Sequence, residues 1–518
     1  MRNITQRDAD AALRRVRALF WIVLIFGVFL RVWNIANVPS GLNQDEASMG
    51  YDAWAILRYG IDRNGTALPV HMIAWGCGQN ALYAYLSMPF IAVFGLNAFS
   101  IRLVSALLAS LTLPVAYLIL KRFAPARTAL IGMGLLAISP WHIMLSRWGL
   151  EANILPAMFA FALFFMVKAL DKPGYFIPAS LLFSLALYAY APSYCVIPVF
   201  YGGAFLIFWF KKTINRKILT LGAVSFVLVA IPILLFVLTN FFKWGDIHIG
   251  PLTAPQISAS EARFSSAMSG GSLVGRIDNF YQNVILQRDW TTWNTLEPYG
   301  VFYVISLPFT LLGIVSAWTK RTPLTYLLSG WLGAGLLLFV LMRSTNINRV
   351  NIVFLPLILF AAMGLADVMK RDWKRILAIV LTYCILFTGF ATGYVKQYVQ
   401  EQNSAFYADL GEAIQKANEA ADADDTIYVT TEINMPYIFV LFYTQIPPRE
   451  YLETVQIEDY EAEFRSVSTF GRYVFDTGAL EASAPGLYII PAYHAETYAQ
   501  FGDEVFYCGK YIVMSITE

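Results

Sequence analysis

The chain has 518 residues, of which 58% are hydrophobic and only 14% are charged. This composition is too apolar for a soluble protein of that length and indicates a protein of the lipid bilayer. A net charge of +2 excludes the strongly basic surface that nucleic acid binding requires. The four cysteines lie far apart with no C-x-x-C pair, so neither a disulfide framework nor a zinc cluster is indicated.

Apolar runs predict about eleven transmembrane helices. The first run, from Ala18 to about Val38, follows an arginine-rich N-terminus and is long enough for a retained helix rather than a signal peptide. Ten more predicted spans cover residues 103–120, 129–145, 154–169, 175–190, 196–210, 218–241, 301–318, 324–342, 352–366 and 376–394. The run over residues 82–96 is interpreted as a partly buried or interfacial helix. Counting it as a span would move every later basic loop to the outer side of the membrane.

Lysine and arginine cluster in alternate connections, in KRFAPAR, KALDKPG, KKTINRK, TKRTP and KRDWKR. The positive-inside rule places these segments and the N-terminus in the cytoplasm. Four regions then face outward, namely residues 39–102, 146–153, 240–300 and everything after about residue 395. In the last region a helix-like pattern is followed by the strand-like patterns TIYVTTEI, GLYIIPAY and YIVMSI. We therefore expect a membrane domain over residues 1–395 and a small extracytoplasmic α/β domain over residues 396–518.

The first outward loop contains SGLNQDEASMGYDA, which is rich in acids in a chain that otherwise avoids them. Asp45 and Glu46 can simply begin an amphipathic helix, whose N-terminal end favours negative charge. Alternatively, they form a general base or a metal-binding pair at the mouth of a membrane cavity. Tyr51 and Asp52 follow in the same stretch and are candidates for lining that cavity.

A second stretch, LAISPWHIMLSRWGLEANILP, is predicted to reach the same side of the membrane. It contains His142, Arg147 and Glu151. An arginine and a glutamate four residues apart on a helix can pair with each other. If they do not, all three side chains are candidates for a substrate cavity that the two stretches share.

The order of these features resembles the membrane-embedded GT-C glycosyltransferases. The first span, the DE loop, YLSMPFIAVFGLNAFSIRLVSALLASLTLPVAYLI and AISPWHIMLSRWGLEAN are most similar to the protein O-mannosyltransferase and aminoarabinose transferase group, glycosyltransferase family 39 and its bacterial relatives. The resemblance is strongest over residues 41–169 and continues as topology to about residue 394. It implies transfer of a sugar from a polyprenyl-phosphate donor to a hydroxyl at the outer face, with inversion. Asp45 would be the base, and Glu46 a companion that holds substrate or contacts a metal.

The leaving lipid phosphate calls for cationic partners. The candidates are Arg147 and, in the outward segment MRSTNINRVN, Arg343 and Arg349, although arginines at helix ends often only reach for the membrane interface. Some relatives carry a basic residue just after the DE pair, where this chain has Ala47, Ser48 and Met49. Phosphate binding must then come from elsewhere in this chain.

Two further features have alternative interpretations. Trp290 and Trp293, in RDWTTWNTLEPYG, suit sugar binding but also suit the aromatic belt at a membrane interface. No cofactor is indicated except a divalent cation, used by some relatives and not by others, for which Asp45, Glu46 and His71 would be the ligands.

The favoured function is therefore a multi-pass glycosyltransferase of the cytoplasmic membrane with an outward-facing active site. Its partners would be a polyprenyl-phosphate sugar, an acceptor on a glycan, lipid or protein, and the bilayer, but no nucleic acid. A transporter or flippase of lipid-linked sugars is the alternative, and such a protein should place polar residues on broken helices near the membrane midplane. A scaffold that presents the C-terminal domain is a third hypothesis, under which the DE stretch would be dispensable.

Overall fold

The computed structural model describes residues 6–76, 78–257, 270–291, 293–370, 372–397, 405–460, 462, 464–480, 484–498 and 502–517. The chain divides into two compact units. Unit 1 consists of Met1–Trp33, Ser105–Ile231 and Ala267–Tyr394, and unit 2 consists of Asn34–Val104, Pro232–Ser266 and Val395–Glu518.

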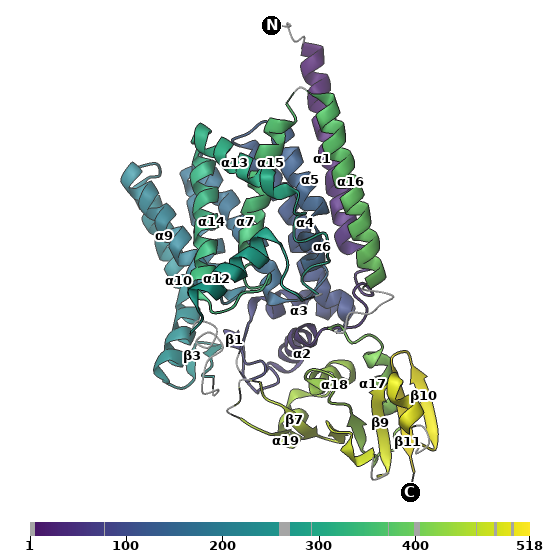
Figure 1. Cartoon of the computed structure of the whole chain (residues 1–518). Helices are drawn as coiled ribbons and strands as arrows, with labels where there is room; N and C mark the ends of the chain where they lie inside the picture. The colour runs from purple at the N-terminus through teal and green to yellow at the C-terminus, as the bar shows by residue number, and fades with distance from the viewer. Residues whose placement is uncertain are drawn as a thin grey trace. The chain divides into compact units, whose positions relative to one another are not determined.

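Unit 1 is a bundle of apolar helices (Figure 1). Its helices, including three that extend past its bounds, are α1 (Gln6–Val32), α4 (Ala98–Lys121), α5 (Ala126–Ile138), α6 (Pro140–Ser146), α7 (Glu151–Ala169), α8 (Phe176–Leu185), α9 (Ser193–Lys211), α10 (Arg216–Phe242), α12 (Leu273–Phe280), α13 (Ser306–Lys320), α14 (Pro323–Leu341), α15 (Phe354–Val368) and α16 (Trp373–Val395). The terminal helices α1 and α16 lie side by side, with the rings of Phe26 and Phe387 in contact. These apolar helices account for the high hydrophobic content of the chain.

Each of the eleven predicted spans coincides with a helix or a bent pair of helices. Among the described residues, seven helices are long and apolar enough to cross a membrane, or eight if the pair α5–α6 is one span. Helices α1, α8 and α13 are outside that set, so the count of eleven crossings stays a prediction.

The predicted span over residues 129–145 coincides with two helices rather than one. Helices α5 and α6 meet at an angle of 58°. Ser139 has extended backbone dihedrals and caps α6 by accepting a hydrogen bond from the backbone N–H of His142. Pro140 then occupies the first position of α6, where its missing N–H costs nothing. The bend places His142 on a short separate helix, with Arg147 directly after its end.

Helices α13 and α15 pack very closely. A Cβ added at Gly313 would lie 1.8 Å from the carbonyl oxygen of Phe360, and one added at Gly364 would lie 2.0 Å from that of Phe309. Only glycine permits this approach, which is the usual way for membrane helices to gain backbone contact.

Unit 2 combines the first predicted outer loop with the C-terminal region. The loop forms α2 (Gln44–Tyr59), α3 (Leu82–Phe94) and the short antiparallel pair β1 (His71–Met72) and β2 (Gln79–Asn80). A second antiparallel pair consists of β3 (Ile247–Ile249) and β4 (Leu252–Ala254). At 13 residues, α3 is a short helix, in agreement with its interpretation as something other than a span.

The C-terminal region of unit 2 contains a seven-stranded mixed sheet in the order β10-β11-β9-β5-β8-β7-β6. Its strands are β5 (Ile427–Val429), β6 (Gln456–Ile457), β7 (Val467–Phe470), β8 (Tyr473–Val474), β9 (Gly486–Pro491), β10 (Glu504–Cys508) and β11 (Tyr511–Ile516). Strand β5 is parallel to both of its neighbours, and the other pairs are antiparallel. Its helices are α17 (Leu410–Ala420), α18 (Pro436–Thr444), α19 (Pro448–Thr454) and α20 (Ala495–Tyr498).

Helix α18 packs against α2, so the sheet-containing region supports the loop that carries the DE pair. The predicted fold class, a polytopic α-helical membrane protein with a C-terminal α/β region, is confirmed. The domain boundary at residue 395 and the placement of residues 396–518 outside the membrane stay predictions.

Candidate active site

Asp45 lies in the first turn of α2, where the helix start holds it in place. Asn43 caps the helix by accepting a hydrogen bond from the Asp45 N–H at 2.9 Å, and its own N–H donates to Glu46 at 3.1 Å. The half-buried Asp45 carboxylate accepts hydrogen bonds at Oδ1 from Trp75 Nε1 at 3.2 Å and Gln79 Nε2 at 3.0 Å. The acids do begin a helix, and one of them is held in a fixed orientation at its N-terminal end, where negative charge is favoured.

Glu46 forms a fully buried ion pair with Arg102. Arg102 Nε and Nη2 donate to the two carboxylate oxygens at 2.8 and 2.9 Å, and neither side chain is exposed. The guanidinium also donates to carbonyl oxygens of the segment that leads into α2, those of Ile35, Ala36, Pro39 and Gly41. Arg102 therefore fixes the segment that leads into the DE pair. This geometry is that of a positioning residue for Glu46, whose direct role toward substrate or metal stays a prediction.

The segment that leads into α2, residues 35–43, is also held by residues at the start of the C-terminal region. Gly41 has φ of 77°, and a Cβ there would lie 1.9 Å from the carbonyl oxygen of Phe406, so glycine is required. Asn43 Nδ2 donates to the Ala405 carbonyl at 2.9 Å, and the Phe406 ring lies 5.8 Å from the Arg102 guanidinium carbon. The start of the C-terminal region thus helps to shape the turn before Asp45.

Asp52 is connected to Asp45 by a chain of polar contacts. Arg63 lies 3.5 Å from Asp52 Oδ2 and donates from Nη2 to Ser48 Oγ at 2.7 Å. Ser48 Oγ donates to Gln79 Oε1 at 3.0 Å, which leaves the Gln79 amide group to donate to Asp45. Both Asp52 and Arg63 are almost completely buried. The chain orients the amide of Gln79, and through it the catalytic candidate.

Two buried carboxylates share this one arginine. Burial raises the pKa of Asp52, while the charge of Arg63 opposes the shift. Burial, with a contribution from Asp52, raises the pKa of Asp62 to about 7, although backbone N–H groups of Thr66 and Asn64 donate to it. Burial therefore favours the protonated, neutral form of both carboxyl groups.

The remaining predicted residues of unit 2 are buried. The Tyr51 hydroxyl donates to the Ile446 carbonyl at 2.6 Å, and burial raises its pKa. His71 stacks on Phe236 with ring centroids 4.1 Å apart, and burial lowers its pKa to about 3. That Tyr51 and Asp52 line a substrate cavity stays a prediction.

A metal site at these residues does not fit their contacts. Arg102 engages both oxygens of Glu46, and His71 is packed against an aromatic ring. Within the described ranges, no group of three or more His, Cys, Asp or Glu side chains could hold an ion. We therefore derive no chemical step through a metal.

In unit 1, His142 and Arg147 are both tied to the C-terminal end of α1. His142 Nδ1 lies 2.6 Å from Nη2 of the buried Arg31, which also donates to the Leu136 carbonyl at 3.0 Å. Arg147 donates to the carbonyls of Leu30 at 3.0 Å and Trp33 at 2.8 Å. Arginines commonly bind the last carbonyls of a helix in this way. The contacts fasten α1 to α5 and α6, and the phosphate-binding role of Arg147 stays a prediction.

Glu151 opens α7 and is 8% exposed. It is buried at the helix end where a carboxylate interacts favourably with the helix dipole. Its assignment to the substrate cavity is untested.

The structure brings together two loops of unit 1, around residues 289 and 347, that were each predicted separately to face outward. Asp289 Oδ2 accepts a hydrogen bond from the Ile347 N–H at 2.8 Å, and Asn294 donates to the same oxygen at 2.6 Å. The tryptophan segment and the MRSTNINRVN segment are therefore joined. Asp289 was missed, because nothing in its local sequence identifies a partner 58 positions away.

The candidate side chains on these two loops differ in their exposure to solvent. Trp290 is 69% exposed, with the Arg288 guanidinium carbon 4.0 Å from its ring centroid, whereas Trp293 is half-buried. Arg343 is exposed, and Arg349 donates to the carbonyl and hydroxyl of Ser344 in its own loop. Of the two arginines, Arg343 is the one whose side chain is open to a ligand.

Comparisons with known proteins bear on this arrangement. A family model described as "Dolichyl-phosphate-mannose-protein mannosyltransferase" matches residues 79–236. No curated protein matches the chain by sequence.

Solved structures match over nearly the whole chain. ArnT from Cupriavidus metallidurans bound to undecaprenyl phosphate has a TM-score of 0.62 at 14% identity, over 96% of this chain and 98% of that chain. The Archaeoglobus fulgidus oligosaccharyltransferase tethered with an acceptor peptide has a TM-score of 0.54 at 13% identity, over 97% and 74%. The predicted resemblance is confirmed: the chain is a polytopic membrane protein with the GT-C glycosyltransferase fold.

Proposed function

We propose that the chain transfers a sugar from a polyprenyl-phosphate carrier to an acceptor hydroxyl at the outer face of the cytoplasmic membrane. The carrier class is supported by the mannosyltransferase family description and by the undecaprenyl phosphate in the similar ArnT structure. The observation that carries the proposal is Asp45. It is a half-buried carboxylate at a helix N-terminus, held by two N–H donors above a buried Glu46–Arg102 pair.

The proposed reaction is a single displacement. Asp45 accepts the proton of the acceptor hydroxyl as its oxygen bonds to the anomeric carbon of the sugar. The bond from that carbon to the phosphate oxygen breaks, and the polyprenyl phosphate leaves with the electron pair. Since the nucleophile attacks opposite the leaving group, the anomeric configuration inverts. Trp75 and Gln79 donate to Oδ1 and so orient the carboxylate that we propose takes the proton.

For the leaving phosphate we propose Arg343 ahead of Arg147 and Arg349. The latter two donate to carbonyl oxygens, whereas the guanidinium of Arg343 is exposed and can offer two parallel N–H groups to phosphate oxygens. Among the predicted cavity residues, Trp290 is the most exposed aromatic side chain, and an exposed aromatic ring suits the apolar face of a sugar.

The test compares lipids and surface glycans by mass spectrometry in cells with the wild-type protein, Asp45→Asn, a deletion, and Glu419→Gln as a control. Glu419 is an exposed acid on α17, so its substitution should change nothing. We expect the Asp45→Asn and deletion strains to lose the same sugar and to accumulate a polyprenyl-phosphate sugar.

The transport alternative gives a different result. If Asp45→Asn matches wild type at equal protein level while the deletion alone disturbs lipid-linked sugars, the transferase proposal is wrong. Transport of the lipid-linked sugar would then be the better account.

A further inference from the structure

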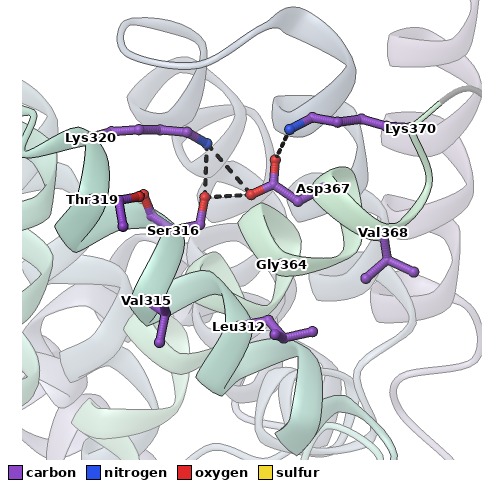
Figure 2. Close-up of a pocket in the computed structure, with 9 residues that line it drawn as sticks. All are labelled: Leu312, Val315, Ser316, Thr319, Lys320, Gly364, Asp367, Val368 and Lys370. Carbon is purple, nitrogen blue, oxygen red and sulfur yellow. Dashed lines mark hydrogen bonds and ion pairs between the residues drawn. The ribbon is translucent and has the colours of Figure 1, made fainter.

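Unit 1 has a cavity of about 500 Å³ whose lining includes none of the candidate site residues (Figure 2). It opens between α13 and α15, next to the close glycine contact of these helices. The lining residues are Leu312, Val315, Ser316, Thr319, Lys320, Gly364, Asp367, Val368 and Lys370.

The α13 wall is a single helix face. Its five lining residues follow the spacing i, i+3, i+4, i+7 and i+8, which places them in one stripe. The side chains of this stripe change from apolar to polar along the helix. Leu312 and Val315 come first and are 50% and 62% exposed, and the polar residues Ser316, Thr319 and Lys320 follow toward the helix end.

Two lysines from opposite sides of the cavity converge on one carboxylate, as Figure 2 shows. Lys320 Nζ lies 3.6 Å from Asp367 Oδ2 and 2.8 Å from Ser316 Oγ, and Lys370 Nζ pairs with Asp367 Oδ1. The lysine side chains are 58% and 68% exposed, so these ion pairs contribute little and can be exchanged.

The charged groups and the apolar wall together indicate which class of ligand fits the cavity. Two lysines and one aspartate sum to +1, which complements the single negative charge of a phosphodiester. A soluble phosphate would use only the charged end, whereas Leu312, Val315 and Val368 offer a surface for a hydrocarbon chain. We propose that this cavity binds an anionic phospholipid, with its phosphate between Lys320 and Lys370 and an acyl chain along Leu312 and Val315.

The position of the cavity in the sequence agrees with this ligand. Lys320 belongs to TKRTP and Lys370 to KRDWKR, both of which the positive-inside rule assigns to the cytoplasmic side. Basic pockets between helices on that side match the negative surface of the inner leaflet. The site would therefore lie in the opposite leaflet from the proposed transfer reaction, and its existence does not depend on that reaction.

The experiment measures lipid binding to the purified full-length protein in neutral detergent by native mass spectrometry, with phosphatidylglycerol as the probe. Lys320→Gln/Lys370→Gln should bind about 30-fold more weakly, because each lysine near an anionic surface contributes a factor of roughly five. The matched control is Lys374→Gln, an exposed lysine at the start of α16 that does not line the cavity. It should bind like wild type.

A second variant separates a binding site from a structural ion-pair cluster. Asp367→Asn removes the competing carboxylate, so phosphatidylglycerol should bind more tightly than to wild type, whereas loss of a structural cluster would weaken binding. Undiminished binding by the double lysine variant, or weaker binding by Asp367→Asn, would overturn the proposal. So would displacement of the lipid by glycerol phosphate at equal concentration, which would show that the apolar wall contributes nothing.

Discussion

Replacing Arg102 with methionine should destabilise unit 2 severely. The substitution leaves the Glu46 carboxylate, which is 0% exposed, without its cation, and leaves four carbonyl oxygens without their donor. Removing one partner of a buried pair costs about 3–5 kcal/mol. At roughly 2 °C per kcal/mol for a unit of this size, we expect the Tm to fall by about 6–10 °C. In the double variant Arg102→Met/Glu46→Met no charge is left unpaired, so the loss should be smaller than the sum of the two single losses.

The assay is thermal unfolding of the purified protein in detergent, followed by tryptophan fluorescence, together with limited proteolysis of residues 34–44. The matched control is Arg58→Met, an exposed arginine on the same helix α2, which should change stability by no more than about 0.5 kcal/mol. A Tm for Arg102→Met within 2 °C of wild type, or equal losses for Arg102→Met and Arg58→Met, would refute the assignment of Arg102 as the residue that fixes the DE loop.

Three further predictions concern charge and metal. The pKa of Asp62 is about 7 in the folded state and near 4 in the unfolded state. Between these two pH values the folded state binds more protons than the unfolded state. The stability that Asp62 contributes is therefore lost as the pH rises from about 4 through 7. Asp62→Asn should therefore flatten the fall in Tm between about pH 4 and pH 7, and an unchanged slope over that range would contradict this. Arg343→Ala should weaken use of the lipid-linked donor by roughly 10- to 100-fold with little effect on the acceptor, with Arg343→Lys in between; equal effects on both substrates would reassign Arg343. EDTA should leave transfer intact, and loss of activity that added Mg²⁺ or Mn²⁺ restores would show that a metal takes part.

The helical bundle could be predicted because its signals are local. The spans were predicted from apolar runs, and each basic loop follows such a run directly, so no long-range contact had to be known. The break within the predicted span 129–145 also had a local signal. Ser139 followed by Pro140 is the usual start of a new helix, and it lies between apolar residues on both sides.

The contacts that orient the candidate site could not be predicted, because their partners are far apart in the sequence. Arg102 is 56 positions from Glu46, and Gln79 is 31 positions from Ser48. Sequence patterns show that Arg102 ends a loop and that Gln79 is polar, and they contain no information about which buried group each one meets. Only the folded loop shows that these residues converge on α2.

The pairing of two acids at the start of α2 follows from the geometry of a helix. Adjacent residues point about 100° apart around the helix axis, so two neighbouring carboxylates cannot face the same surroundings. Glu46 points inward to Arg102 and is completely buried, while Asp45 is half-buried and meets Trp75 and Gln79. A buried, ion-paired glutamate fixes the rotation of the helix about its axis, and this rotation in turn fixes the direction of the neighbouring aspartate. We infer that the DE pair combines one acid that fixes the helix with one that is thereby oriented for the proposed proton transfer.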